Sequence, residues 1–239
     1  MDKGATGSTA PETHAQVSQP TGAQLQHPWE VTPAEAIAIQ RRLAPLAAQA
    51  PTVALADITT VAGVDASYTD IGRAAVVVFT FPELVEIDRA TAVRSCVFPY
   101  MPGLLSFREV PVALDALAKL THPPDLLICD GQGYAHPRRF GLACHLGLLA
   151  NIPAIGCAKS RLTGKYTEPG PNKGDSSPLM DRGEQIGVVL RSKPRTNPLF
   201  ISRGYRTDLA TAVAVVLACL RGYRLPETTR AADKLAGER

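Results

Sequence analysis

The sequence predicts an α/β domain in which a mixed β-sheet is flanked by helices. From residue 60 to residue 98, β-branched runs alternate with turn residues, which is typical of sequential antiparallel strands joined by short loops. From residue 104 to residue 158, helical patterns alternate with two short apolar strands. The chain has 239 residues, 45% of them hydrophobic, which suits one domain with a substantial core.

The first predicted element is a helix that begins at Pro33. Thr32 and Glu35 have the spacing of a capping box, and proline is favoured at the first helical position. Apolar residues then recur at helical intervals, at Ala36, Ile39, Leu43 and Leu46. We expect Pro45 to end or kink this helix, because proline removes a backbone donor and clashes with the preceding turn.

The next elements are three or four strands. Their sequences are TVAGVDASY from Thr60, AAVVVFT after Gly72, LVEID and TAVRSCVF. A helix over residues 104–120 follows, then a buried strand, DLLICD, then a helix that begins near Pro137 and a short strand, AIGCA. The antiparallel meander therefore leads into strands that alternate with helices.

The remaining elements are a hairpin-like pair of strands and two helices. The strands are EQIGVVLR and LFIS, and the first helix begins near Asp208, a suitable N-cap residue. The last helix is entered at Pro226, and residues 163–182, rich in Gly, Pro, Asp and Ser, are predicted to form a loop. A meander that leads into parallel strands covered by helices is a ribonuclease-H-like arrangement.

Composition limits the class of protein. Residues 1–27 have almost no large apolar side chains, so we expect a disordered N-terminal tail before a single domain at residues 28–239. A net charge of +3 does not single out a polyanionic partner. The five cysteines form no CxxC pair and are expected to be buried thiols. No membrane span or leader is evident, so we expect a soluble, cytoplasmic monomer.

Two aspartates are candidate metal ligands. Asp65 interrupts an apolar strand, where an unpaired carboxylate is costly, and Asp130 ends a buried strand, where ligand crevices form in α/β sheets. Carboxylates on neighbouring strands make the oxygen site that Mg²⁺ prefers, and Glu109 is a plausible third ligand. The alternative is that each aspartate is an ordinary surface or turn residue.

The segment DGQGYAHPRR, which follows that strand, is a candidate binding loop. It matches the GxGxxG pattern only in part, and no Walker lysine follows. Gly131 and Gly133 would permit close backbone approach to a ligand, and His136, Arg138 and Arg139 would add donors. A solvated helix start would explain the same residues.

Two further residues have an alternative structural explanation. Lys159 follows the strand AIGCA and would reach the same crevice, although a lysine directly after a strand is more commonly a solvent-exposed residue. Tyr100 lies between two prolines in PYMPG, and a rigidly held aromatic ring can stack on bases or wedge between them. The same turn could instead pack on the core.

Several separated segments resemble the endonuclease V family. They are VAGVDASY, PYMPGLLSFREVP, the stretch from DLLICDGQGYAHPRRF to AIGCAKSRL, and GYRLPETTRAADKLA. The resemblance runs from residue 61 to residue 239 and implies a ribonuclease-H-like fold. It also implies a DNA repair nuclease that cuts the second phosphodiester bond 3′ to deoxyinosine, leaving 3′-hydroxyl and 5′-phosphate ends, with Mg²⁺ as cofactor and Mn²⁺ as a substitute.

The resemblance assigns roles to the candidate residues. Asp65, Asp130 and Glu109 match the metal site, and Tyr100 matches a tyrosine that fills the gap left by the displaced base. The remaining matches are Gly131 and Gly133 in the pocket for the flipped base, with His136 and Lys159 near the cleaved phosphate.

Three positions depart from the family pattern. Gln132 replaces a common His or Asn, Cys157 replaces a valine, and Tyr205 stands where many members have histidine. If that histidine belongs to the active site, its absence changes the ligand set near it. Two alternative functions therefore stay open: an endoribonuclease that acts on inosine in RNA, and a nucleic-acid binding protein without catalysis.

Overall fold

The computed structural model describes residues 25–68, 71–96 and 98–238. Within them, one sheet has eight strands. Their bounds are β1 Thr60–Tyr68, β2 Ile71–Thr80, β3 Glu86–Ser95, β4 Leu126–Cys129, β5 Ala154–Ala158, β6 Ser176–Asp181, β7 Glu184–Leu190 and β8 Leu199–Arg203. The helices are α2 Pro33–Gln49, α3 Ser106–Leu117, α4 Leu142–Ala150, α5 Leu209–Ala218 and α6 Glu227–Gly237, with a 3₁₀ turn at Leu55–Asp57.

The sheet is mixed, as predicted. Its strand order is β3-β2-β1-β4-β5-β8-β7-β6. The meander β1-β2-β3 is antiparallel, β1, β4 and β5 are parallel, and β8, β7 and β6 continue the sheet in antiparallel order. The three parallel strands therefore end at the same edge in the middle of the sheet, where a ligand crevice is expected.

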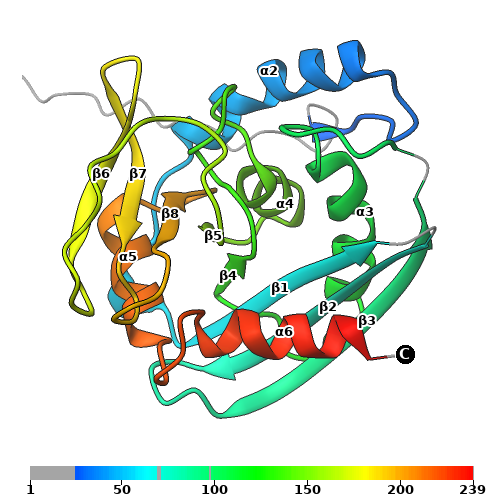
Figure 1. The fold of residues 1–239 in the computed structure, drawn as a ribbon. Helices are drawn as coiled ribbons and strands as arrows, with labels where there is room; N and C mark the ends of the chain where they lie inside the picture. The colour runs from blue at the N-terminus through cyan, green and yellow to red at the C-terminus, as the bar shows by residue number, and fades with distance from the viewer. Residues whose placement is uncertain (1–24, 69–70, 97, 239) are drawn as a thin grey trace, which may run out of the picture.

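Helices cover both faces of this sheet (Figure 1). On one face, α5 and α6 pack on side chains that include Val61 and Ile128. On the other, α3 and α4 pack on side chains that include Ala62 and Leu127. Helix α2 lies outside α4, where Leu43 is fully buried. Two hydrophobic cores thus hold the central strands from opposite sides.

Most predicted elements are confirmed, and one predicted helix start is wrong. Helix α2 has the predicted capping box but continues past Pro45 to Gln49, since its buried face packs on α4. The segments LVEID and TAVRSCVF belong largely to one strand, β3. Helix α4 begins at Leu142, because Arg139 has a positive φ of 57° that breaks a helix there.

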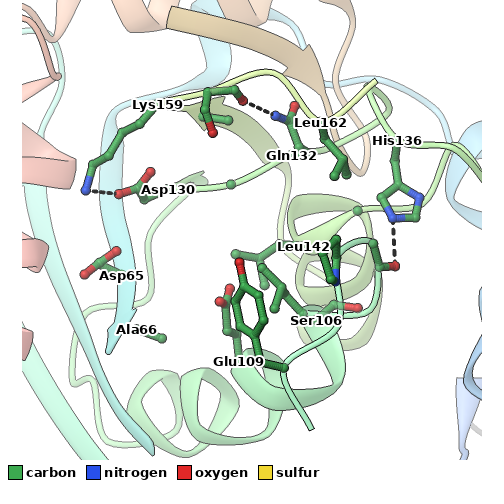
Figure 2. Close-up of a pocket in the computed structure, with 18 of the residues that line it drawn as sticks. Asp65, Ala66, Ser106, Glu109, Asp130, Gln132, His136, Leu142, Lys159 and Leu162 are labelled. Atoms are coloured by element: carbon green, nitrogen blue, oxygen red, sulfur yellow. Dashed lines mark hydrogen bonds and ion pairs between the residues drawn. The ribbon is translucent and has the colours of Figure 1, made fainter. Parts of the chain in front are cut away.

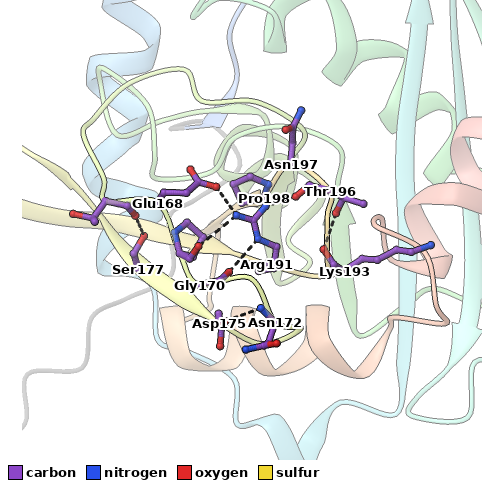
Figure 3. Close-up of polar contacts among 12 residues, drawn as sticks. Glu168, Gly170, Asn172, Asp175, Ser177, Arg191, Lys193, Thr196, Asn197 and Pro198 are labelled. Atoms are coloured by element: carbon purple, nitrogen blue, oxygen red, sulfur yellow. Dashed lines mark hydrogen bonds and ion pairs between the residues drawn. The ribbon is translucent and has the colours of Figure 1, made fainter.

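The predicted loop at residues 163–182 contains a strand. Strand β6 pairs with β7 across a two-residue turn, Arg182 and Gly183, whose φ values of 53° and 81° suit a hairpin. The preceding residues are held by the buried guanidinium of Arg191, which donates to Glu168 and to the carbonyl of Gly170 (Figure 3). Arg191 also donates to the carbonyl of Thr196.

Most of the expected N-terminal tail lies outside the described residues, whereas all five cysteines lie within them. Of residues 1–27, the first 24 lie outside the described residues, and His27 contacts Trp29 and His145. Four cysteines are buried as predicted, whereas Cys96 is half-buried, and all five are free thiols. Among the described helices, none has the length and apolar character needed to cross a membrane.

Candidate active site

A cavity of about 540 Å³ opens at the ends of β1, β4 and β5 (Figure 2). This volume falls in the range of small-molecule sites. Asp65, Asp130 and Lys159 lie at one end of the cavity, which we call the acidic end. Ser106 and Leu142, the first residues of α3 and α4, lie on the opposite side, which we call the far end.

Asp65 and Asp130 emerge on the same face of the sheet. Side chains alternate along a strand, so Asp65 shares a face with Val61, and Asp130 shares a face with Ile128. Val61 and Ile128 pack with α5 and α6. The backbone N–H of Asp130 donates to the carbonyl of Val64, which is the neighbour of Asp65 (3.1 Å). Both carboxylates therefore face α6.

Helix α6 supplies a third aspartate, which the sequence analysis missed. Oxygen atoms of Asp65, Asp130 and Asp233 all lie within 4.8 Å of one another, a spacing that suits a metal ion. Helix α6 approaches β1 closely because Gly63 has no side chain, and an added Cβ would overlap the carbonyl oxygen of Thr228. The compact group therefore consists of Asp65, Asp130 and Asp233, and Glu109 lines the same cavity outside this group.

Lys159 joins two of these carboxylates. Its Nζ lies 2.5 Å from Oδ2 of Asp130 and 3.1 Å from Oδ1 of Asp233. Burial lowers the pKa of Lys159, but hydrogen bonds and charge from both aspartates outweigh it and raise that pKa above its ordinary value. The predicted position of Lys159 at the crevice is confirmed, and the lysine stays charged.

The carboxyl groups of Asp65 and Glu109 bind protons more tightly than isolated carboxylates do. Burial and the neighbouring charge of Asp130 raise the pKa of Asp65 to about 7. Burial, with the charges of Asp65 and Asp130, raises the pKa of Glu109 to about 8. One lysine does not compensate these acids, so a divalent cation would be stabilised here.

Glu109 approaches the cavity from the opposite layer. It lies in the first turn of α3, whose buried residues pack on the other face of the sheet, and its side chain is directed into the cavity (Figure 2). Asp65 and Glu109 thus line the cavity from the two faces of the sheet.

The predicted aromatic residue lies at the cavity rim. Tyr100 is 72% exposed, so its ring is available for stacking. The carbonyl of Gly103, at the end of the same turn, accepts hydrogen bonds from Gln40 Nε2 (3.0 Å), His136 Nε2 (2.9 Å) and Arg138 Nη2 (2.7 Å). Gly103 has a φ of 80°, which glycine adopts without strain. The turn that carries Tyr100 is therefore firmly held.

The candidate binding loop separates into lining and supporting residues. Gly131 and Gln132 line the cavity, whereas Gly133 is buried behind it and donates its N–H to Ser202 Oγ (2.9 Å). His136 lines the cavity, but Nε2 donates to Gly103 and Nδ1 accepts from the N–H of Arg138. Burial lowers the pKa of His136 to about 4, so this ring is neutral and joins two loops.

Tyr205 does not belong to the site. Its carbonyl accepts from the N–H of Ala154 at the start of β5, whereas Lys159 follows the other end of that strand. The buried ring packs with Phe140 and Leu148, and its hydroxyl lies 3.1 Å from Oδ1 of Asn151. The position where many family members have histidine therefore lies apart from the acidic end.

Comparison with known proteins places the chain in a family. A family model described as Endonuclease V matches residues 42–234. An Endonuclease V from Roseiflexus castenholzii is 53% identical over 215 residues, which cover 89% of this chain and 95% of that protein. The chain belongs to the Endonuclease V family. It is a nuclease, and the predicted family is confirmed.

Solved Endonuclease V structures have the same fold. That from Streptomyces avermitilis has a TM-score of 0.81 and 44% identity, with 87% of this chain and 92% of that chain covered. A Ciona intestinalis Endonuclease V, in complex with a 24mer DNA containing an inosine followed by a ribo-adenosine, has a TM-score of 0.73 and 26% identity. That match covers 85% of this chain and 95% of the other. These neighbours confirm the ribonuclease-H-like fold.

Proposed function

We propose that this protein is a repair endonuclease that nicks DNA beside deaminated bases, deoxyinosine foremost, with Mg²⁺ as its cofactor. The observation that carries the proposal is the group of carboxylates at one end of a cavity with the volume of a small-molecule site, in an Endonuclease V fold. The related Ciona intestinalis protein, bound to inosine-containing DNA, supports the choice of substrate.

The donor set fits a magnesium ion. All ligands are carboxylate oxygens, which Mg²⁺ prefers, and the raised pKa of Asp65 reflects burial together with the negative charge of Asp130, which a cation would offset. Asp65 and Asp130 would hold the ion, with Asp233 adding a ligand from α6 and Glu109 from α3. A bound ion of this kind activates water and offsets charge that develops on the phosphate.

Lys159 has a separate role in this proposal. Its ammonium group holds Asp130 and Asp233 in place, which keeps their oxygens directed at one point. Because the Lys159 side chain is half-exposed at the acidic end, its ammonium group would attract the phosphate backbone of the substrate. Lys159 therefore both orients the acids and draws the strand toward them.

Base recognition is assigned to the rest of the cavity. A flipped base would enter the cavity beyond the acidic end, and Tyr100 would fill the gap left in the stack. Flipping costs least at a mispaired base, which favours damaged sites. By analogy with the family, the cut falls at the second phosphodiester bond 3′ to the lesion and leaves 3′-hydroxyl and 5′-phosphate ends.

RNA is the second candidate substrate. The Ciona intestinalis ligand carries a ribo-adenosine after its inosine, which favours testing RNA beside DNA. The non-catalytic alternative loses its main argument, since Tyr205 lies away from the carboxylates.

The decisive experiment is a nicking assay on matched DNA and RNA oligonucleotides, each with one inosine. Mg²⁺, Mn²⁺ and a chelator are compared for the parent protein and for Asp65→Ala. Preferential magnesium-dependent cutting of DNA, lost in Asp65→Ala, is expected. Preference for RNA would move the substrate to transcripts. Cutting that persists in the chelator or in Asp65→Ala would overturn the metal site.

A further inference from the structure

A chain of hydrogen bonds runs from the cavity toward the protein surface through two histidines. Ser106, which lines the far end of the cavity, has its Oγ 3.1 Å from Nδ1 of His145. Nε2 of the fully buried His145 lies 2.9 Å from Nε2 of His27. Nδ1 of His27 lies 2.9 Å from the carbonyl oxygen of Pro28. We call these three side chains the histidine relay.

The carbonyl of Pro28 fixes the direction of every bond in this relay. A carbonyl only accepts, so Nδ1 of His27 carries a hydrogen. Burial lowers the pKa of His27, and the neutral ring then has a lone pair on Nε2. Nε2 of His145 must therefore donate to it. Burial also lowers the pKa of His145 well below its ordinary value, which leaves Nδ1 of this ring as an acceptor.

It follows that the Ser106 hydroxyl donates its hydrogen to Nδ1 of His145. A hydroxyl has one hydrogen and two lone pairs, so Oγ can then only accept from any other group. Ser106 and Leu142 line the same end of the cavity, at the starts of α3 and α4 (Figure 2). Ser106, which is 3% exposed, thus brings to the cavity wall a hydroxyl that cannot turn its hydrogen toward a base without disrupting the relay.

We propose that Ser106, oriented by His145 and His27, selects bases that present a ring N–H at the far end of the cavity. This inference rests on the proposed function and names the chemical feature by which the site distinguishes a deaminated base from its parent, adenine or cytosine. Deamination of adenine turns N1 from an acceptor into an N–H donor, and deamination of cytosine does the same at N3. An obligate acceptor therefore accepts from the ring N–H of hypoxanthine or uracil, as it would from guanine or thymine, and opposes the lone pair of adenine or cytosine.

The base-reading test compares two substrates on two proteins. DNA with one deoxyinosine is matched with DNA carrying deoxynebularine, a purine whose N1 has no hydrogen and whose C6 has no oxygen. The parent is expected to prefer deoxyinosine, and Ser106→Ala should reduce that preference about tenfold. Ser106→Thr keeps a hydroxyl and should retain the preference. Deoxynebularine lacks the C6 oxygen whichever protein is tested. The effect of that oxygen therefore cancels when the preference of Ser106→Ala is divided by the preference of the parent.

The outcomes separate this inference from the proposed function. If the parent nicks deoxyinosine and Ser106→Ala has the same preference, the inference is overturned while the nuclease assignment stands. If the parent nicks neither DNA, the preference is measured as the ratio of binding affinities for the same two duplexes. An unchanged ratio in Ser106→Ala again overturns the inference.

The relay has a readout that does not depend on activity. In ¹⁵N-histidine NMR of the full chain, His145 should be neutral with its hydrogen on Nε2. His27→Phe retains an aromatic ring beside Trp29 and Phe107 but removes the acceptor, so the tautomer of His145 should become mixed and the deoxyinosine preference should fall. A His145 hydrogen on Nδ1 in the parent would overturn the proposed orientation of Ser106.

Discussion

Gly63 on β1 lies directly against the carbonyl group of Thr228 on α6, and this contact brings Asp233 to Asp65. Gly63 is two residues before Asp65 on the same face of the strand. Any side chain at this position would separate the helix from the sheet. The geometry of the acidic end thus depends on a residue that has no functional group.

Gly63→Ala should push α6 away from β1 and reduce both stability and nicking. Overpacking of this kind costs about 1–3 kcal/mol of unfolding free energy. Urea unfolding and a nicking assay on the folded protein would measure the two effects. Gly237→Ala, on α6 itself, is the matched control, because no atom lies within 4 Å of its added Cβ. Full nicking in Gly63→Ala would show that the approach of α6 is unimportant.

Asp233→Asn tests the ligand that helix α6 contributes. Loss of one carboxylate should weaken Mg²⁺ binding and slow nicking by about 10²-fold or more, with the fold retained because Asp233 is exposed. A magnesium titration of the nicking rate would detect the change. Asp208→Asn, which caps α5 outside the cavity, is a suitable control for a surface Asp-to-Asn change. Equal magnesium dependence in Asp233→Asn and the parent would remove this ligand from the site.

The metal-free protein should lose stability as the pH rises from about 4 to about 8. The pKa of Asp65 is raised to about 7 and that of Glu109 to about 8, so the folded state binds more protons than the unfolded state in this range. Stability then falls with pH by at most about 1.4 kcal/mol per pH unit for each group.

Urea unfolding with a chelator, repeated at several pH values, would measure this slope. Glu109→Gln should flatten it, because the substituted side chain does not titrate. Adding Mg²⁺ should restore stability most at high pH, where the carboxylates are charged. A metal-free protein that gains stability across this pH range would contradict the raised pKa values.

Tyr100→Ala should weaken binding to inosine-containing duplex by about 1–3 kcal/mol, because a stacking contact is lost. Stability should be unchanged, since the ring is 72% exposed. Fluorescence anisotropy would measure affinity, with Tyr223→Ala as a control at another exposed tyrosine. Undiminished affinity in Tyr100→Ala would exclude the wedge role.

Tyr205→Phe should leave nicking unchanged and lower stability by about 1 kcal/mol, because only the hydroxyl contact with Asn151 is lost. Activity per folded molecule and thermal unfolding would test both statements. A large loss of nicking with normal stability would return Tyr205 to the active site.

The sequence predicted the elements that depend on local patterns. The capping box of Thr32 and the N-cap of Asp208 are confirmed because each depends on neighbouring residues alone. Asp65 and Asp130 were identified because a carboxylate in or beside an apolar strand is conspicuous. The Arg182–Gly183 turn carried a hairpin signal that loop-like composition obscured.

Asp233 was missed for a different reason. It is an ordinary polar residue of an amphipathic helix, and only the packing of α6 on β1 brings it to the other acids. The histidine relay was likewise unpredictable, since Ser106, His145 and His27 come from three distant segments. Contacts of this kind depend on tertiary structure, which local sequence patterns do not contain.

The sheet separates the three aspartates of the cavity from the proposed base-reading residue, Ser106. The aspartates face α6, whereas Ser106 and Leu142 belong to helices on the opposite face. Substitutions in α3 and α4 can therefore alter which bases enter without displacing the three aspartates. Provided that Glu109 of α3 is retained, lesion range and catalytic chemistry are thus free to evolve independently in this fold, and an altered-specificity variant should be sought among the other residues on the α3–α4 side.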